Sequence, residues 1–154
     1  MDDNISVLIA DDHALFRTGL RTLLAGIPGI AVVGEAVNGQ EMVEMGLLLK
    51  PDVIITDVEM PIMSGAEATK ILCKKIPYCR VLVLSVHTKE EIVLKMIEAG
   101  AMGYILKNAE ADEIREAIFV IEQYKPFFCK LVTRMLTEIV SRHLKFPPKA
   151  PIFF

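Results

Sequence analysis

The sequence predicts an α/β doubly wound fold, in which a five-stranded parallel sheet carries helices on both faces. Five short runs rich in β-branched residues alternate with segments of helical periodicity, which is the pattern of repeated strand–helix–strand units. The runs are almost continuously apolar, as expected for strands buried on both faces of a parallel sheet. We expect right-handed crossovers between them.

The five expected strands follow one another along the first two thirds of the chain. They are Ile5–Ala10, Ile30–Ala36, Asp52–Thr56, Arg80–Ser85 and Ala101–Leu106. Each is separated from the next by a helical pattern, so consecutive strands can lie parallel.

The helices are indicated by an apolar stripe and by start signals. The first helix places an apolar stripe, formed by Leu15, Phe16, Gly19, Leu20, Leu23 and Leu24, opposite Arg17 and Arg21. Asn38, Ser64 and Thr88 each stand three residues before a glutamate, which predicts a capped helix start at each place. A fifth helix is expected from Ala109 to Gln123.

The pattern changes after this helix, so we divide the chain into a domain of residues 1–124 and a linker of residues 125–154. The linker begins with an extra C-terminal helix, whose apolar stripe comprises Phe128, Leu131, Val132, Met135, Leu136, Ile139 and Val140. It ends in "KFPPKAPIFF", where the prolines prevent a helix. Either a second domain is missing after this tail, or the tail folds back on the core.

Composition argues against several classes of protein: nucleic-acid-binding, disulfide-rich or zinc-binding, secreted and membrane-spanning. The net charge is −3, and 17 basic residues are scattered among 20 acidic ones, which argues against nucleic-acid binding by this chain itself. Cys73, Cys79 and Cys129 form no CxxC pair, so we expect reduced thiols rather than a disulfide or zinc framework. The acidic N-terminus is unlike a signal peptide, and no apolar stretch reaches membrane-spanning length. We therefore expect a cytoplasmic protein without membrane contact.

Polar residues follow four of the expected strands, where an open parallel sheet has its functional crevice. Asp11 and Asp12 follow the first strand, Asp57 the third, Ser85 ends the fourth, and Lys107 comes after the fifth. Three carboxylates in one crevice would repel one another unless a cation lay among them. Because two or three aspartates without a nearby histidine or cysteine suit a hard divalent ion, we predict Mg²⁺, with Mn²⁺ as the alternative.

Each of these residues also has a simpler explanation when taken alone. Asp11 and Asp12 could only cap the first helix, and Asp57 could be a turn residue. Lys107 could be a solvated charge and Ser85 a cap. Their joint position, each at the carboxyl end of a different strand, favours a single site.

These motifs resemble the receiver domain of two-component response regulators. The resemblance is carried by "ADD" with Asp11 and Asp12, "DVEMPIMSG" with Asp57, "LVLSVH" with Ser85, and "GYILK" with Tyr104 and Lys107. It covers residues 4–123 and implies a flavodoxin-like strand order of 2-1-3-4-5. The phrases "LFRTGLRTLL", "LSVHTKEE" and "AGAMGYILKNAEADEIREAI" are similar to the NarL/FixJ (LuxR-type) group. Members of that group usually continue into a helix-turn-helix DNA-binding domain, which would start where this chain ends.

The resemblance implies a phosphorylation switch rather than an enzyme. A sensor histidine kinase would donate a phosphoryl group to Asp57. Asp12, Asp57 and the main-chain carbonyl of Glu59 would bind the metal directly, and Asp11 would act through water. Lys107 would pair first with Asp57 and then with a phosphoryl oxygen.

Ser85 and Tyr104 are the implied switch residues. Ser85 would offer its hydroxyl to the phosphoryl group and move inward, and Tyr104 would fill the space it leaves. The alternative for Tyr104 is an aromatic ring that caps the sheet with its hydroxyl in water. The output would be a homodimer, formed through the first and fifth helices or through the fourth and fifth, that regulates transcription through the further domain; the extra helix either adds its stripe to the dimer or packs on its own domain.

Several roles stay open at this stage. Glu59 and His87 either tune hydrolysis of the aspartyl phosphate or are solvated side chains, and His13 is expected only to begin the first helix. Asn108 stands where many receivers have proline, which leaves open whether the Lys107–Asn108 peptide bond is cis.

Two other function classes fit less well. A phosphohydrolase similar to the haloacid dehalogenase group needs an aspartate two residues after the nucleophile, where this chain has Glu59. A flavin carrier of the same strand order needs hydroxyls and backbone donors after the first strand, where this chain has the acidic "DDHALF".

Overall fold

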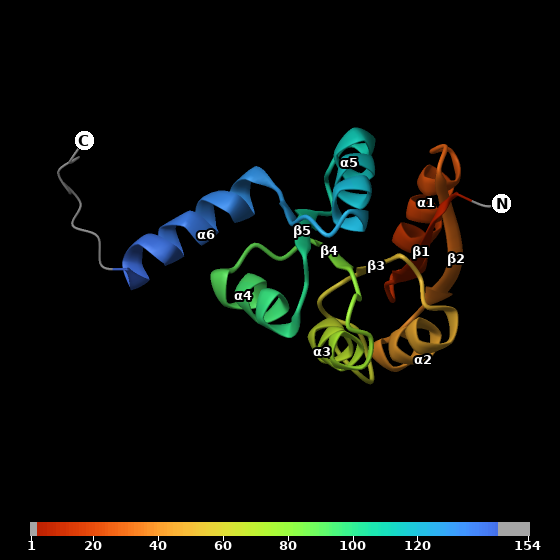
Figure 1. The fold of residues 1–154 in the computed structure, drawn as a ribbon, viewed down its shortest axis with the longest axis horizontal. Helices are drawn as coiled ribbons and strands as arrows, with labels where there is room; N and C mark the ends of the chain where they lie inside the picture. The colour runs from red at the N-terminus through yellow and green to blue at the C-terminus, as the bar shows by residue number, and fades with distance from the viewer. Residues whose placement is uncertain (1–2, 145–154) are drawn as a thin grey trace.

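The computed structural model describes residues 3–144 and has a parallel sheet at its centre. The strands lie in the order β2-β1-β3-β4-β5-β6 (Figure 1). Their bounds are β1 Ile5–Ala10, β2 Ile30–Ala36, β3 Val53–Thr56, β4 Val81–Ser85, β5 Gly103–Leu106 and β6 Phe127–Phe128. The predicted order of the first five strands is therefore confirmed, and a short sixth strand extends the sheet beyond β5.

Helices cover both faces of the sheet, as predicted. In Figure 1, α1 and α5 lie on one side of the strands and α2, α3 and α4 on the other. The helix bounds are α1 Ala14–Ala25, α2 Gly39–Leu49, α3 Gly65–Lys75, α4 Glu90–Ala99, α5 Ala111–Glu122 and α6 Lys130–His143. This arrangement buries the central strands from both sides.

The core explains why the strand sequences are apolar throughout. Every residue of β3 and β4 is buried, and the adjacent β1 is buried at all positions except Ser6. A strand covered by helices on both faces has no solvent-facing side, so a polar side chain would lose hydration at any position within it. The polar groups of these strands are therefore confined to their ends, which is where the site lies.

Two of the three predicted helix caps are confirmed. The Asn38 side chain accepts a hydrogen bond from the backbone N–H of Glu41, and the Ser64 side chain accepts one from that of Glu67. The predicted cap at Thr88 is wrong, because α4 begins one residue later and its N-cap is Lys89, without a side-chain cap bond. Two glutamates in the first turn of α4 complement the helix dipole instead.

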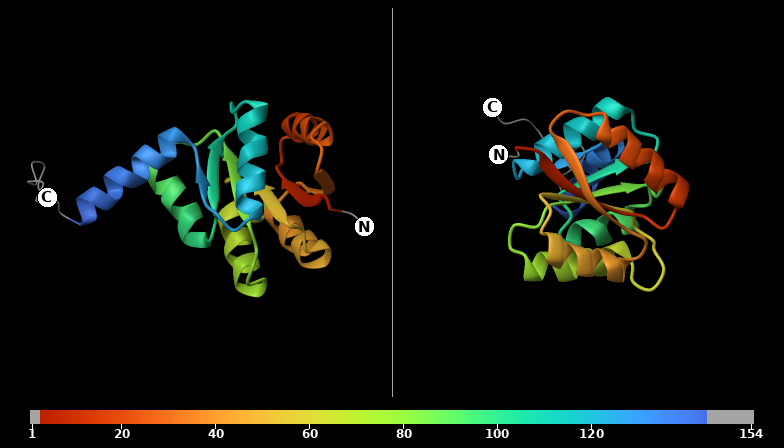
Figure 2. Two further views of the ribbon diagram at one scale, coloured as in Figure 1. Left: turned by 45° about the horizontal axis from the view of Figure 1, so that its top comes forward. Right: turned by 90° about the vertical axis from the view of Figure 1, so that its right-hand side faces the viewer.

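The strand β6 was not predicted from the sequence, and Phe128, which was expected in the apolar stripe of the extra helix, lies in this strand. The Phe127 N–H donates to the Met102 carbonyl and the Cys129 N–H to the Tyr104 carbonyl, both at 3.1 Å, so the start of the predicted linker pairs with β5. Helix α6 follows at once and projects from the body of the domain (Figure 2). Val132 and Ile139 on α6 are buried. The proline-rich tail predicted from residue 145 onward lies outside the described residues.

The cysteines agree with the expectation of free thiols. Cys73 and Cys79 are half-buried and Cys129 is buried, and no disulfide joins any of these three described residues. A hydrogen bond with Cys79 lowers the pKa of the Cys73 thiol, an interaction that the sequence spacing did not indicate.

Candidate functional site

Three strand ends bring opposite charges together at one edge of the sheet. Lys107, just after β5, places its Nζ atom 2.8 Å from Asp11 Oδ2 and 2.9 Å from Asp57 Oδ2. Asp11 follows β1 and Asp57 follows β3, and both are buried. The convergence predicted from the sequence is therefore present, and in this structure the cation between these two carboxylates is the lysine ammonium.

The electrostatics of Lys107 reflect this position. Burial alone would lower its pKa, but the hydrogen bonds and negative charges of Asp11 and Asp57 outweigh burial and raise the pKa. The Nζ atom also lies 4.4 Å from the centre of the Phe16 ring, which places an aromatic face against the cation. Lys107 is thus held charged and fixed beside the Asp57 carboxylate.

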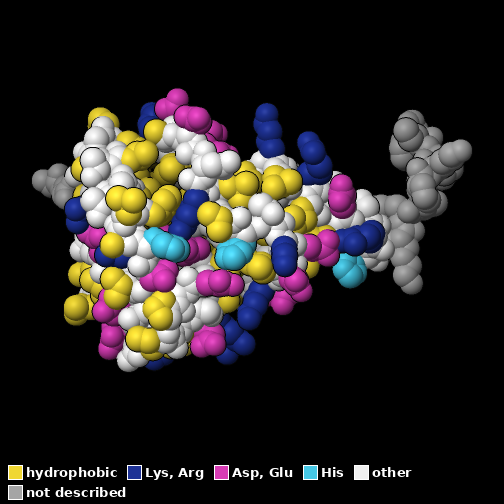
Figure 3. All heavy atoms as spheres, turned by 180° about the vertical axis from the view of Figure 1, so that it is seen from behind, with side chains coloured by type: hydrophobic (Ala, Val, Ile, Leu, Met, Phe, Trp, Pro, Cys, Tyr) yellow, Lys and Arg dark blue, Asp and Glu magenta, His cyan; other side chains and the backbone are white. Residues whose placement is uncertain are grey.

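A cavity of about 390 Å³ opens above this ion pair. Its walls come from the four loops that follow β1, β3, β4 and β5, and the lining residues are Asp12, His13, Asp57, Glu59, Met60, Pro61, Val86, His87 and Lys107. Figure 3 shows one face of the molecule on which histidine side chains lie next to acidic and basic ones. The cavity gives a small anionic group a route to the otherwise buried Asp57 carboxylate.

The loop after β3 holds Asp57 in a fixed orientation. The Val58 N–H donates to Asp57 Oδ1 at 2.7 Å, and the Thr56 hydroxyl donates to the Asp57 carbonyl at 2.8 Å. The chain then returns so closely that a Cβ atom at Gly65 would lie 2.0 Å from the Asp57 carbonyl oxygen, so only glycine fits there. Between them, Ile62 has a φ of 72°, which is a strained conformation for a β-branched residue.

Four side chains around the cavity can hold a metal ion. Ligand atoms of Asp11, Asp12, His13 and Asp57 all lie within 4.8 Å of one another. The three predicted aspartates belong to this group, and oxygen-rich sites suit Mg²⁺. His13 was expected only to begin α1, and it is indeed the N-cap, but its ring also faces the cluster.

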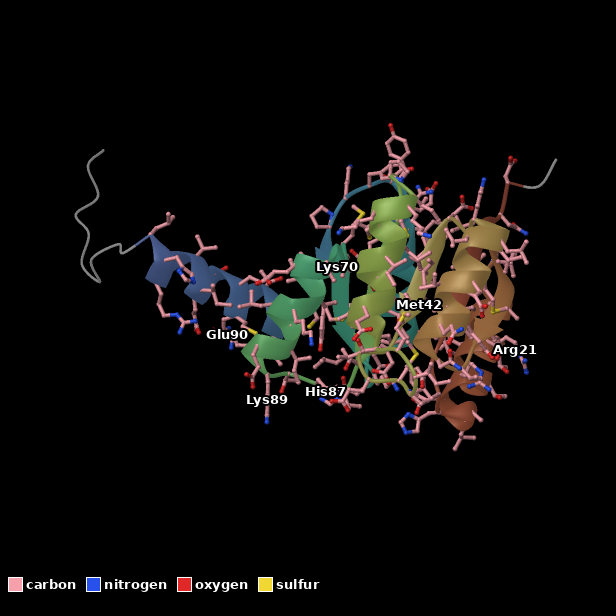
Figure 4. The ribbon with its side chains drawn as sticks, turned by 90° about the horizontal axis from the view of Figure 1, so that it is seen from below. Arg21, Met42, Lys70, His87, Lys89 and Glu90 are labelled. Carbon is pink, nitrogen blue, oxygen red and sulfur yellow. The ribbon has the colours of Figure 1, made fainter. Side chains whose placement is uncertain are left out.

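Glu59 and His87 lie on the rim of the cavity. The Glu59 side chain is 75% exposed, and its Oε2 atom is 3.7 Å from His87 Nε2. His87 lies in the loop that leads into α4, close to Lys89 and Glu90 (Figure 4). Among the described residues, the peptide bonds are all trans, which answers the question left open for Lys107–Asn108.

Ser85 and Tyr104 are buried beside this rim. Ser85 Oγ accepts a hydrogen bond from the His87 N–H at 3.0 Å, and the Tyr104 hydroxyl donates to the His87 carbonyl at 2.7 Å. Both side chains are fully buried, so the alternative of a Tyr104 hydroxyl in water is not what the structure contains. Burial raises the pKa of Tyr104, and the nearby charge of Asp57 adds to this, while a hydrogen bond with Ser85 opposes it.

Comparison with known proteins gives one consistent result. Residues 7–119 match the model of the response regulator receiver domain. The chain is 39% identical over 141 residues to the transcriptional regulatory protein DegU of Brevibacillus brevis, covering 92% of this chain and 60% of the relative. The chain thus spans less than two thirds of the length of this curated relative.

Solved structures agree with the sequence comparison. A LuxR-family two-component response regulator from Aurantimonas sp. SI85-9A1 superposes with a TM-score of 0.82 at 30% identity, covering 89% of this chain and 99% of that one. RcsB, solved as two dimers bound to two parallel DNAs, gives a TM-score of 0.78 at 27% identity, covering 87% of this chain and 68% of that one.

In residues 3–144, no helix is long and apolar enough to cross a membrane.

Proposed function

Because the chain belongs to the response regulator receiver family, we propose that it is a phosphorylation-dependent signalling switch whose phosphoryl acceptor is Asp57. The observation that carries this proposal is the position of Asp57: its carboxylate is buried, lines the cavity, and is held 2.9 Å from the Lys107 ammonium. A buried carboxylate with a fixed cation and an open approach on one side is suited to act as a nucleophile. The donor in this proposal is a phosphohistidine of a sensor histidine kinase.

The transfer step uses groups that are already in place. An oxygen of Asp57 forms a bond to phosphorus while the bond between phosphorus and the donor nitrogen breaks, roughly in line. Lys107 lies next to the attacking carboxylate and can follow the negative charge onto a phosphoryl oxygen without leaving the cavity wall. Positioning and charge neutralisation are the main contributions that proteins make to phosphoryl transfer.

The aspartates of the cavity fit a divalent ion. Asp12 and Asp57 would bind it directly, with the Glu59 main-chain carbonyl, and Asp11 would act through water. When bound, Mg²⁺ supplies neutralisation of the crowded phosphoryl oxygens.

The switch in this proposal involves Ser85 and Tyr104. The Ser85 hydroxyl would turn from the His87 N–H toward the phosphoryl group, while Tyr104 would remain buried. The Tyr104 side chain is already buried in this structure, which has no phosphoryl group. Phosphorylation would therefore increase the population of a conformation that the unphosphorylated chain can also adopt.

The output is proposed from the relatives. DegU is named as a transcriptional regulator and RcsB was solved as DNA-bound dimers. We propose a cytoplasmic homodimer that acts on DNA through a further C-terminal domain following the linker of residues 125–154. The dimer would use the surface of α1 and α5 or that of α4 and α5, and the chain itself would not turn over a substrate as an enzyme.

The test is intact-mass measurement after incubation with acetyl phosphate and Mg²⁺. The wild type and Asp52→Asn should gain one phosphoryl group, because Asp52 binds Ser6 and is not part of the cavity lining. Asp57→Asn should gain none, and excess EDTA should prevent the gain. A wild type that binds Mg²⁺ but gains no mass would contradict the proposal, and release of excess phosphate from small phosphoesters would favour a phosphohydrolase.

A further inference from the structure

A lysine and a histidine contact the aspartate cluster from different sides, the lysine through Oδ2 atoms and the histidine through Oδ1 atoms. Lys107 contacts the Oδ2 atoms of Asp11 and Asp57. The His13 Nδ1 atom lies 3.5 Å from Asp11 Oδ1 and 3.8 Å from Asp12 Oδ1. The lysine therefore occupies one edge of the cluster, and the imidazole faces the other.

The backbone fixes His13 at this edge. Its N–H donates to Asp11 Oδ1 at 2.8 Å, which closes a tight turn directly after β1. His13 is also the N-cap of α1, so its backbone is anchored on the following side by the helix. The ring itself is 72% exposed, and within residues 3–144 its Nδ1 atom lies near two carboxylates, both of which belong to the cluster. The imidazole can therefore turn toward an ion without leaving the carboxylates that it already faces.

The spacing of these atoms is close to that of a coordination shell. Ligands on opposite sides of one ion are about 4 to 4.4 Å apart when each bond is about 2.0 to 2.2 Å long. The ligand atoms of Asp11, Asp12, His13 and Asp57 lie within 4.8 Å of one another, so small side-chain rotations would bring the His13 imidazole onto an ion held by Asp12 and Asp57. Such an ion would have one nitrogen ligand beside its carboxylate oxygens.

A nitrogen ligand changes which ion such a site prefers. Mg²⁺ takes oxygen ligands almost exclusively, whereas imidazole is a good ligand for first-row transition ions. We propose that His13 supplies a nitrogen ligand when a transition ion such as Mn²⁺ occupies this cavity, and that this contact raises the affinity for Mn²⁺ relative to Mg²⁺. The inference rests on the proposed function only in that a divalent ion binds at this cluster.

The test uses Mn²⁺ as a paramagnetic probe on the full chain. Electron spin-echo envelope modulation should show a coupled ¹⁴N nucleus in the wild type and in His87→Gln, and none in His13→Gln. His87→Gln is the matched control, since His87 also lines the cavity but pairs with Glu59 on the rim. The Kd for Mn²⁺, from the free-ion signal, should rise about tenfold in His13→Gln. The Kd for Mg²⁺, from competition, should change less than twofold.

Two results would overturn the inference. One is a ¹⁴N signal that persists in His13→Gln, and the other is an equal loss of Mn²⁺ and Mg²⁺ affinity, which would mean that His13 only positions the aspartates. Phosphorylation of the wild type with Mg²⁺, measured in parallel, separates this inference from the proposed function. A wild type that gains phosphate but lacks the ¹⁴N signal contradicts the inference alone, and a wild type that binds neither ion contradicts both.

Discussion

Two regions of the molecule are stabilised by different forces. One is the edge of the sheet formed by Asp11, Asp57 and Lys107, called the acceptor edge after the proposed role of Asp57. The other is the C-terminal extension, residues 127–143. At the acceptor edge, side-chain charges meet at 2.8 to 2.9 Å in a largely buried place. The extension has main-chain pairing of β6 with β5 and the burial of Val132 and Ile139. In the proposed function, the acceptor edge carries the chemistry, because it holds the Asp57 carboxylate beside the Lys107 ammonium. The extension is held by backbone pairing and apolar packing, so in the proposed function it would respond to phosphorylation by a change of conformation.

Tyr104 joins the two regions. Its hydroxyl donates to the carbonyl of His87, a residue of the cavity wall, and its own carbonyl accepts the N–H of Cys129, the N-cap of α6. A change in the His87 loop therefore has a path of two hydrogen bonds to the start of α6. The comparison predicts that charge changes act strongly at the edge and that packing changes act strongly in the extension.

The largest effect is expected for Lys107→Met at the acceptor edge. The substitution leaves Asp11 and Asp57 buried without their shared cation, so the free energy of unfolding in EDTA should fall by about 3 kcal/mol. Urea unfolding followed by circular dichroism measures it. The double variant Asp11→Asn with Lys107→Met should recover part of the loss. Equal stability of wild type and Lys107→Met would show that the charges at this edge are not energetically linked.

A smaller effect is expected in the extension for Val132→Ala. Val132 is fully buried, and removing two methyl groups from a packed site should lower the free energy of unfolding by about 2 kcal/mol. Its neighbour Leu131 is 41% exposed, so Leu131→Ala is the matched control and should cost less than about 0.5 kcal/mol. If the two variants were equally stable, α6 would not be packed on the domain in solution.

An effect of about 1 kcal/mol at neutral pH is expected for Tyr104→Phe, which loses the hydrogen bond to the His87 carbonyl. This difference should shrink as the pH rises. Burial raises the pKa of Tyr104 above the ordinary value of 10.0, so the folded chain holds the phenol proton more tightly than the unfolded chain. As the pH rises above 10, the free energy of unfolding of the wild type therefore falls, because the unfolded chain loses the phenol proton first. Tyr104→Phe has no phenol at this position and does not show this fall. Thermal melts from pH 7 to 11 measure the difference, and a constant gap across this range would be the contrary result.

The smallest effect is expected for the exposed ion pair that joins the extension to α4. Arg142 Nη2 lies 2.7 Å from Glu90 Oε1, but both side chains are substantially exposed. Arg142→Ala should change the free energy of unfolding by about 0.5 kcal/mol or less, and high salt should remove even that. A loss comparable to that of Val132→Ala would mean that charge, rather than packing, holds α6.

The fold was predictable because its strands are buried on both faces. Runs such as "VLVLS" cannot be confused with solvent-facing strands, and the strand order follows from the family resemblance. The strand β6 was not predictable, because two residues, Phe127 and Phe128, are too short a run to carry an alternating pattern. Thr88 misled the cap prediction, since the chain continues for one more extended residue before α4 begins.

The site was predictable where position along the chain determines position in space. Asp11, Asp57 and Lys107 each follow a strand, and parallel strands end at one edge. The orientation of His13 depends on the turn that its own N–H closes with Asp11, which residue spacing does not encode. The burial of Tyr104 likewise depends on a hydrogen bond to the carbonyl of His87, a residue 17 positions earlier in the chain.

The most direct test of the link between the two regions is hydrogen–deuterium exchange with and without acetyl phosphate and Mg²⁺. A phosphoryl group on Asp57 should favour the buried state of Tyr104 and so slow amide exchange in peptides covering β6 and the start of α6 in the wild type. Asp57→Asn should show no change. Slower exchange in the loop after Asp57 with unchanged exchange across residues 127–143 would contradict the account, because the acceptor would then be filled without any effect on the extension.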